Sequence, residues 1–269
     1  MRRLLPITSA AGSCCRAPAC GMRVPGTGEH TATAEAPDLW PCFSNPPMGG
    51  RRFLYDVSVR TQKSTSGRLA RAVKKARTAC LDLRYGGLLN KSPESRYRHL
   101  GARYSANTDY DALPYIFPDG SIKPSDVLVD VGCGFGRVIN WWLSRGLRNQ
   151  IVGVELDPDI AAKTRCRLRR YANVAVVTGD VVELMPGPIP RDATVFYLFH
   201  PFERPAMQRF KARVEEVYRG RRLRLYYYVP AHADLFDDDP QWEVQRRSLG
   251  SPWPHRQEFA LLTLQAGAA

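Results

Sequence analysis

Long uncharged apolar runs are missing from this 269-residue sequence, because Asp130, Arg137 and Glu155 interrupt its strongest apolar stretches. A membrane-spanning helix needs about 20 consecutive apolar residues, so the sequence predicts no membrane span. Paired C-x-x-C spacing is also missing, and the five histidines are scattered, so we expect no metal site. The seven cysteines form no even framework, which indicates a reduced protein in the cytoplasm.

Sustained periodicity is absent from residues 1–50, which are rich in Pro, Gly, Ala, Ser and Cys. This composition predicts a disordered tail outside the folded domain. The first acid is Glu29, and the basic start before it is also typical of a mitochondrial transit peptide, which makes a mitochondrial location the alternative. A third interpretation is that translation starts at Met48 and the preceding residues are a mis-assigned extension.

Positive charge is concentrated in one segment of the chain. The net charge is +13, and residues 51–104 hold fourteen Lys/Arg against three Asp/Glu, whereas the other segments are nearly balanced. This segment suits nucleic acid, anionic lipid or an acidic protein partner, and the alternative is a solvated basic helix. From Ser66 to Leu83 the spacing predicts a helix that places Leu69, Val73, Ala76 and Cys80 on one face. We expect residues 51–120 to form a basic helical lead-in, with a short helix at Tyr110 to Ile116.

Strand and helix signals alternate after Ser125. Short apolar stretches typical of buried strands occur at Val127 to Val131, Ile151 to Val154, Val174 to Val177, Thr194 to Phe199 and Leu223 to Val229. Helical patterns lie between them, one of which starts with Asp157 as N-cap and Pro158 in the first turn. Two further strands follow Pro240. The order predicts an α/β, doubly wound, mostly parallel seven-stranded Rossmann-like sheet with a terminal antiparallel hairpin, over residues 121–269.

The stretch "VLVDVGCGFGR", from Val127 to Arg137, joins a strand to a helix through glycines at every second position. Such a turn exposes backbone N–H groups at a positive helix end, which suits a nucleotide-like ligand. The G-x-G-x-G spacing is not the G-x-G-x-x-G dinucleotide fingerprint, and no Lys-Ser/Thr follows as a P-loop requires. Glu155 and Asp180 end the next two strands and can accept hydrogen bonds from ribose hydroxyls and an adenine amino group. Each acid taken alone is equally typical of a helix start.

Together, "VLVDVGCGFGR", "IVGVELDPDIAAK" and "VVTGDVVEL" resemble the successive motifs of class I S-adenosylmethionine-dependent methyltransferases. The resemblance covers about Asp126 to Leu264 and implies S-adenosylmethionine as cofactor. It implies that the acid and glycines of the first motif shape the methionine pocket, that Glu155 holds the ribose, and that Asp180 and Val181 border the adenine. The residues of the first motif are Asp130, Gly132, Gly134 and Gly136. Cys133 fits as a small residue between glycines.

The segment before the first strand, "YSANTDYDALPYIF", is similar to the lead-in of bacterial uncharacterised methyltransferases and, more remotely, of non-SET histone lysine methyltransferases. In those families a polar loop closes over the amino acid end of the cofactor. The resemblance therefore implies a lid in the lead-in, and the candidate residues are Tyr104, Asn107, Thr108 and Tyr110.

Strand four ends in "FYLFHPFER", where amino-group methyltransferases carry Asn/Asp-Pro-Pro-aromatic. His200, Pro201 and Phe202 resemble that motif but depart from it in the histidine and the single proline, which weakens the case for nucleobase amino methylation. His200 is a candidate proton acceptor for a hydroxyl or amine, since its unperturbed pKa is near 6.5. The alternative is a histidine that caps the next helix or packs under Phe202. Tyr226, Tyr227, Tyr228 and Pro230 are candidate walls of the acceptor pocket, and strand alternation places at least one of them in the core instead.

These observations predict methyl transfer from S-adenosylmethionine to an unidentified N or O nucleophile by in-line displacement, possible with or without His200 as base. The acceptor is open: nucleic acid or protein can be held by residues 51–104, and a small molecule is equally admissible. The alternative is a non-catalytic module of the same fold that binds an anionic partner through residues 51–104. A nicotinamide oxidoreductase is disfavoured by the glycine spacing.

Overall fold

The computed structural model describes residues 66–89, 107–249 and 258–267. Internal contacts divide the chain into residues 1–60 and 61–269, and all described residues lie in the second unit. The expectations for residues 1–50 and for Tyr104 therefore lie outside the described residues. Within the described ranges, no helix has the length and apolar character needed to cross a bilayer.

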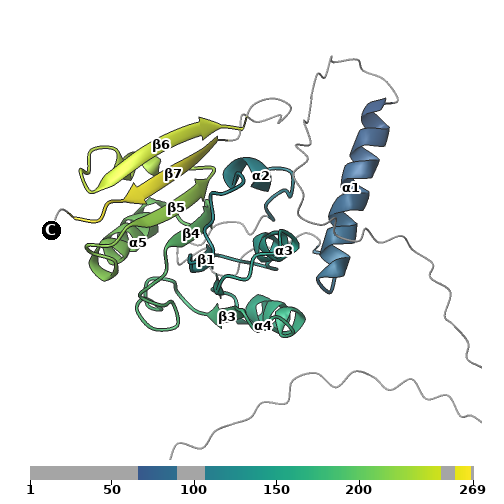
Figure 1. The fold of residues 1–269 in the computed structure, drawn as a ribbon, viewed down its shortest axis with the longest axis horizontal. Coiled ribbons are helices and arrows are strands. Elements are labelled where there is room, and N and C mark those ends of the chain that lie inside the picture. The colour runs from purple at the N-terminus through teal and green to yellow at the C-terminus, as the bar shows by residue number, and fades with distance from the viewer. Residues whose placement is uncertain (1–65, 90–106, 250–257, 268–269) are drawn as a thin grey trace, which may run out of the picture. The chain divides into compact units, whose positions relative to one another are not determined.

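A seven-stranded sheet in the order β3-β2-β1-β4-β5-β7-β6 forms the centre of this unit (Figure 1). The pairings among β1 to β5 are parallel, whereas β7 runs antiparallel to both β5 and β6. The predicted doubly wound sheet with a terminal antiparallel hairpin is thereby confirmed. The strands are β1 (Leu128–Val131), β2 (Ile151–Glu155), β3 (Val174–Thr178), β4 (Val195–Phe199), β5 (Leu223–Tyr228), β6 (Trp242–Ser248) and β7 (Glu258–Leu264).

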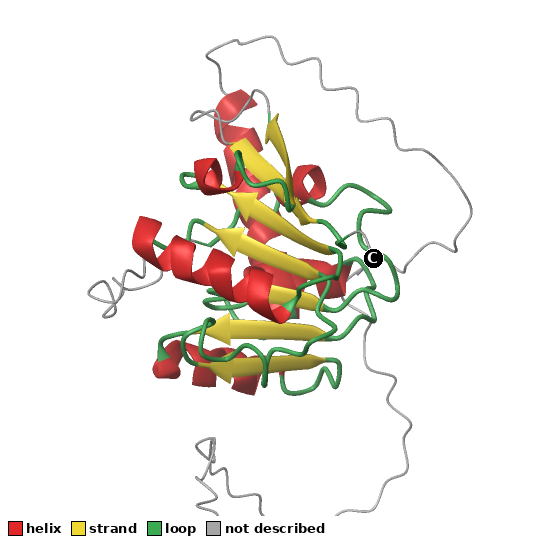
Figure 2. Ribbon diagram, turned by 90° about the vertical axis from the view of Figure 1, so that its left-hand side faces the viewer, coloured by secondary structure: helices red, strands yellow, loops and turns green. Residues whose placement is uncertain are grey.

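Helices lie on both sides of the sheet (Figure 2), because successive strand residues point to opposite faces and the inner strands are buried on both. On one face, Phe210 of α5 packs against Phe196 of β4, with ring centroids 6.2 Å apart. On the other face, Trp142 of α3 belongs to a second core cluster. The helices are α1 (Ser66–Arg84), α2 (Leu113–Ile116), α3 (Arg137–Ser144), α4 (Pro158–Leu168) and α5 (Arg204–Val217), with the 3-10 turn η2 (Ala233–Phe236).

Two strand-to-helix connections position the site at the carboxyl edge of the sheet. The glycine loop leads from β1 into α3, and Gly136 is the left-handed N-cap of that helix, with φ 72°. A Cβ on Gly136 would lie 3.1 Å from Thr164 Cγ2, so this glycine permits close packing on α4. Asp157 caps α4 as predicted, because its side chain accepts from the backbone N–H groups of Asp159 and Ile160.

Helix α1 forms as predicted, but the apolar face predicted for it is exposed to solvent. The side chains of Leu69 and Val73 are 68% and 49% exposed, and Ala76 and Cys80 are exposed as well. The opposite face attaches the helix to the domain, where Asp82 is buried and pairs with Arg137 of α3. The sequence correctly predicted that these four residues share one face of the helix. That this face points to solvent depends on the contacts that the opposite face makes with the domain.

Candidate cofactor and acceptor site

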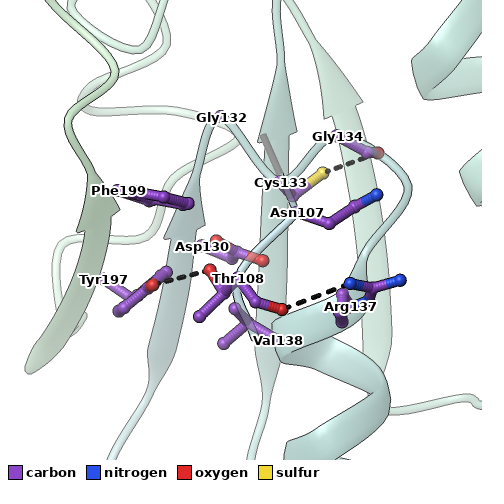
Figure 3. Close-up of a pocket in the computed structure, with 10 residues that line it drawn as sticks. All are labelled: Asn107, Thr108, Asp130, Gly132, Cys133, Gly134, Arg137, Val138, Tyr197 and Phe199. Atoms are coloured by element: carbon purple, nitrogen blue, oxygen red, sulfur yellow. Dashed lines mark hydrogen bonds between the residues drawn. The ribbon is translucent and has the colours of Figure 1, made fainter. Parts of the chain in front are cut away.

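A small polar pocket lies where β1 and β4 end and α3 begins (Figure 3). This is the edge at which open α/β sheets bind their ligands. The lining residues come from the loop before β1, the glycine loop, the first turn of α3 and the end of β4. They are Asn107, Thr108, Asp130, Gly132, Cys133, Gly134, Arg137, Val138, Tyr197 and Phe199.

The carboxyl group of Asp130 is the pocket's acidic element. Asp130 is buried and lies opposite Tyr197 in the β1–β4 register. Its Oδ2 atom has no hydrogen-bond partner among the described residues. Burial, together with the nearby Glu155, raises the pKa of Asp130 to about 8. A buried acceptor without a donor is costly in a folded protein, so this atom is suited to a ligand that brings a donor or a positive charge.

The glycine loop brings the end of β4 close to this pocket. Gly132 and Gly134 both have positive φ, at 71° and 52°, which side chains with a Cβ rarely adopt. A Cβ on Gly132 would lie 3.6 Å from Cβ of Pro201. The His200-Pro201-Phe202 turn therefore lies directly beside the loop predicted to hold the methionine moiety.

Glu155 anchors the glycine loop to the end of β2. Its Oε2 accepts from the Gly134 N–H at 2.8 Å, and its Oε1 accepts from the Asp157 N–H at 2.9 Å. Burial raises the pKa of Glu155, while these two backbone donors oppose that rise. Each carboxylate oxygen retains a second lone pair, which leaves capacity for a ribose hydroxyl.

The predicted adenine-side residues are placed differently. Asp180 is exposed, and its Oδ1 accepts from the Val182 N–H at 2.9 Å, whereas Val181 is buried in the core. Glu155, Asp180 and Val181 do not line the pocket of Figure 3. Of the residues predicted to bind the cofactor, the pocket therefore holds Thr108, Asp130, Gly132 and Gly134 and not those predicted for the ribose and adenine.

The predicted lid residues divide into two groups. Thr108 Oγ1 and Tyr197 Oη are hydrogen-bonded at 2.7 Å in the pocket, and Asn107 Nδ2 donates to the Leu89 carbonyl at 3.1 Å. Tyr110 instead donates its hydroxyl to Asp82 Oδ1 at 2.7 Å and does not line the pocket. Burial raises the pKa of Tyr110, and the hydrogen bond to Asp82 adds to that rise. Tyr110 thus contacts the pocket indirectly, through Asp82, which pairs with the lining residue Arg137.

Backbone strain marks the rim formed by the ends of β4 and β5. His200 and Val229 have φ values of 39° and 52°, and neither is glycine. Such conformations cost about 1–3 kcal/mol each and cluster at functional sites. His200 Nδ1 lies 3.4 Å from Tyr227 Oη, and the rings of His200 and His232 are 5.6 Å apart.

The other predicted acceptor-side aromatics are largely core residues. Phe202 is partly buried and packs on Phe210, with ring centroids 5.4 Å apart. Tyr226, Tyr227 and Tyr228 are all buried. Among these tyrosines, the Tyr227 hydroxyl is the group that reaches His200.

Sequence reasoning missed four pocket residues, which are Arg137, Val138, Tyr197 and Phe199. A signal for Arg137 was present, since a cation directly after the last glycine falls in the first turn of the helix beside the loop. The alternation along β4 places Tyr197 and Phe199 on one face, but it does not show that this face reaches a pocket. For Cys133, burial raises the pKa of the thiol well above its usual value, so the thiol stays neutral and acts as a small packing group.

Residues 128–220 match the family described as a methyltransferase domain. They form a methyltransferase domain. The match confirms the recognition of a class I methyltransferase, and S-adenosylmethionine is the cofactor that accompanies this domain. No curated protein matches the sequence.

Several solved structures are similar to this chain. A proposed RNA methyltransferase from Pyrococcus horikoshii is 17% identical, with a TM-score of 0.50 over 69% of this chain and 97% of that one. An RNA methyltransferase from Salinibacter ruber, solved with S-adenosyl-L-homocysteine, is 20% identical, with a TM-score of 0.45 over 61% and 97%. A proposed methyltransferase from Escherichia coli is 15% identical, with a TM-score of 0.45 over 60% and 89%. The Pyrococcus match shows the same fold.

Proposed function

We propose that the protein transfers a methyl group from S-adenosylmethionine to a nitrogen or oxygen nucleophile. The observation that carries this proposal is the buried Asp130 carboxyl group, which has an unpartnered oxygen in a polar pocket beside the glycine loop. When bound, S-adenosylmethionine supplies a methyl group on a positively charged sulfur. The residues present fit this cofactor, since the loop gives close backbone access and Asp130 gives an acceptor for its ammonium group.

Other residues would hold the remaining parts of the cofactor. Glu155 would accept from the ribose hydroxyls with the lone pairs that Gly134 and Asp157 leave unused. Asp180 and Val181 would border the adenine. Thr108, fixed by its hydrogen bond to Tyr197, would help cover the amino acid end.

The turn after β4 would receive the acceptor. His200 would take the proton that the nucleophile loses, and Tyr227 orients its ring through the Nδ1 contact. Pro201, which lies against Gly132, would wall the acceptor from the glycine loop. Phe202 packs on Phe210 and would stiffen the turn rather than move with the substrate. Alignment of nucleophile and methyl group would contribute most of the rate, since displacement requires mainly geometry.

RNA is the acceptor class that we propose first. The segment 51–104 has an excess of eleven positive charges, and the described part of α1 exposes Arg71, Lys75 and Arg77. Cationic surfaces bind the phosphate backbone without sequence preference. The Pyrococcus protein is named as a proposed RNA methyltransferase, which agrees with this choice.

Calorimetric titration of the full chain with S-adenosylhomocysteine tests the cofactor, with NAD as the control ligand. We expect binding of S-adenosylhomocysteine alone, and a loss of at least tenfold in affinity in Glu155→Ala. No binding by a folded sample would overturn the proposal and favour the non-catalytic module.

Transfer of labelled methyl groups to separated RNA and protein fractions tests the acceptor class. We expect label in RNA, and label in protein alone would overturn RNA as acceptor. His200→Gln should lower kcat by about 10²- to 10⁴-fold while leaving cofactor affinity unchanged, since His200 would act on the acceptor's proton. An unchanged kcat and pH profile would exclude His200 as the base.

A further inference from the structure

One acidic and one basic side chain line the methyltransferase pocket. Among its ten lining residues, Asp130 and Arg137 are the two with charged side chains. Both carry a buried polar atom without a hydrogen-bond partner among the described residues, namely Oδ2 of Asp130 and Nε of Arg137. A carboxylate and a guanidinium with free hydrogen-bonding capacity at one pocket complement a ligand that has both an ammonium and a carboxylate group.

Helix α1 holds the arginine in place. Nη2 of Arg137 donates to Asp82 Oδ2 at 3.0 Å and to the Leu89 carbonyl at 3.0 Å. Nη1 of Arg137 reaches the Thr108 carbonyl at 3.5 Å (Figure 3). The two side chains are largely buried, at 13% exposure for Arg137 and 3% for Asp82. These contacts occupy the two terminal nitrogens and leave the Nε donor unused.

Asp82 is itself fixed by three donors. Besides Arg137, it accepts from the Tyr110 hydroxyl at 2.7 Å and from the Leu89 N–H at 3.3 Å. A buried carboxylate with this many partners holds one geometry, because losing any partner would leave a buried group unsatisfied. Asp82 lies outside residues 128–220, which match the methyltransferase domain. The lead-in helix therefore supplies a rigid support for a pocket residue.

We propose that Arg137 binds the carboxylate of the cofactor's amino acid end, with Asp130 facing its ammonium group, and that Asp82 of α1 positions Arg137. This inference rests on the proposed function, since the ligand is the S-adenosylmethionine of that proposal. Helix α1 then belongs to the cofactor site itself. Arg137 is a binding residue in this arrangement, and Asp82 is a positioning residue.

The test compares S-adenosylhomocysteine with 5′-methylthioadenosine, which shares the adenosine and sulfur but lacks the amino acid. Affinities are measured by calorimetry on the full chain. In Arg137→Gln we expect 10- to 100-fold weaker binding of S-adenosylhomocysteine, with binding of methylthioadenosine within about twofold of wild type. Asp82→Asn should shift the ratio of the two affinities in the same direction by a smaller factor. Arg145→Gln, which removes an exposed arginine paired with Asp119, is the matched control and should leave the ratio unchanged.

The outcomes separate the two proposals. If wild type does not bind S-adenosylhomocysteine, the proposed function fails. If wild type binds it while Arg137→Gln lowers the affinity for both ligands by the same factor, or changes neither affinity, Arg137 has a structural role only, and this inference is overturned. A wild-type titration with decarboxylated S-adenosylhomocysteine needs no variant, so it applies even if Arg137→Gln does not fold. We expect wild type to bind the decarboxylated ligand at least tenfold more weakly than S-adenosylhomocysteine. Equal affinity for the two ligands would overturn the inference.

Discussion

Helices α1 and α5 attach to the domain through opposite kinds of surface. Helix α5 packs Met207, Phe210 and Val214 into the core, as expected for a helix that covers a sheet. Helix α1 exposes Leu69, Val73 and Leu83, places the partly buried Leu81 against the core, and buries the carboxylate of Asp82. Apolar contacts are not directional, whereas a carboxylate with three donors fixes positions closely. The difference indicates that α5 builds the core and that α1 orients a few polar groups near the pocket of Figure 3.

The largest effect is expected where the polar attachment of α1 is removed. Asp82→Ala would leave the charge of Arg137 buried without its partner, so we expect the free energy of unfolding to fall by about 3–5 kcal/mol. Urea denaturation measures this change. Asp119→Ala is the matched control, since its ion pair with Arg145 is exposed and should contribute less than about 1 kcal/mol. Similar small losses in both variants would show that α1 is not fixed by Asp82.

A smaller effect is expected in the apolar packing beneath the glycine loop. A Cβ on Gly153 of β2 would lie 2.9 Å from Ile139 Cδ1 and 3.0 Å from Cys133 Sγ. Both neighbours are buried, so Gly153→Ala should cost about 1–3 kcal/mol through overpacking. Gly187→Ala is the control, because Gly187 does not have a positive φ and an added Cβ would lie 3.6 Å from its nearest neighbour, the Leu184 carbonyl oxygen. Gly146→Ala is unsuitable, since the φ of Gly146 is 77°. A loss in Gly153→Ala no larger than in Gly187→Ala would contradict this packing account.

The buried carboxyl group of Asp130 should make the free energy of unfolding depend on pH. Its pKa is raised to about 8 in the folded chain, while an unfolded aspartate titrates near 3.9. Between these values the folded state holds the proton that the unfolded state has lost, so this contribution to stability is greatest below about pH 4 and declines until about pH 8. The slope is at most about 1.4 kcal/mol per pH unit for one group.

Urea denaturation of ligand-free protein between pH 5 and pH 8.5 measures that slope. Asp130→Asn should flatten it, and Asp180→Asn, at an exposed position, should leave it unchanged. Identical slopes in wild type and Asp130→Asn would mean that Asp130 is ionised throughout this range. The comparison tests the local environment of the pocket independently of any ligand.

The sheet and the glycine loop were predictable because both depend on local patterns. Buried strands such as β4 consist of continuous apolar residues. The positive φ values of Gly132 and Gly134 explain why glycine recurs in the loop after β1. Asp130 follows the apolar stretch directly, so its place at the carboxyl edge was also predictable.

The support of the pocket was not predictable, because it depends on contacts between distant residues. Asp82 meets Tyr110 and Arg137, which follow it by 28 and 55 residues. Periodicity identifies residues that share a helix face, but it does not show which face packs. In the sequence Arg137 stands only at the end of a glycine motif, and its contacts with Asp82 and Leu89 follow from the position of α1. The burial of Phe202 likewise follows from its contact with Phe210 on α5.

The smallest effect is expected on the outward face of α1. Val73 is about half exposed on α1, and Val214 is fully buried on α5, so the same substitution separates the two helices. Val73→Ser should change the free energy of unfolding by no more than about 0.5 kcal/mol, as for other surface positions. Val214→Ser should cost at least about 2 kcal/mol, because it leaves a cavity and buries a hydroxyl. Thermal and urea denaturation of both variants measure the difference. A loss in Val73→Ser close to that in Val214→Ser would show that the apolar face of α1 is covered in the folded protein, and that α1 and α5 attach by the same principle after all.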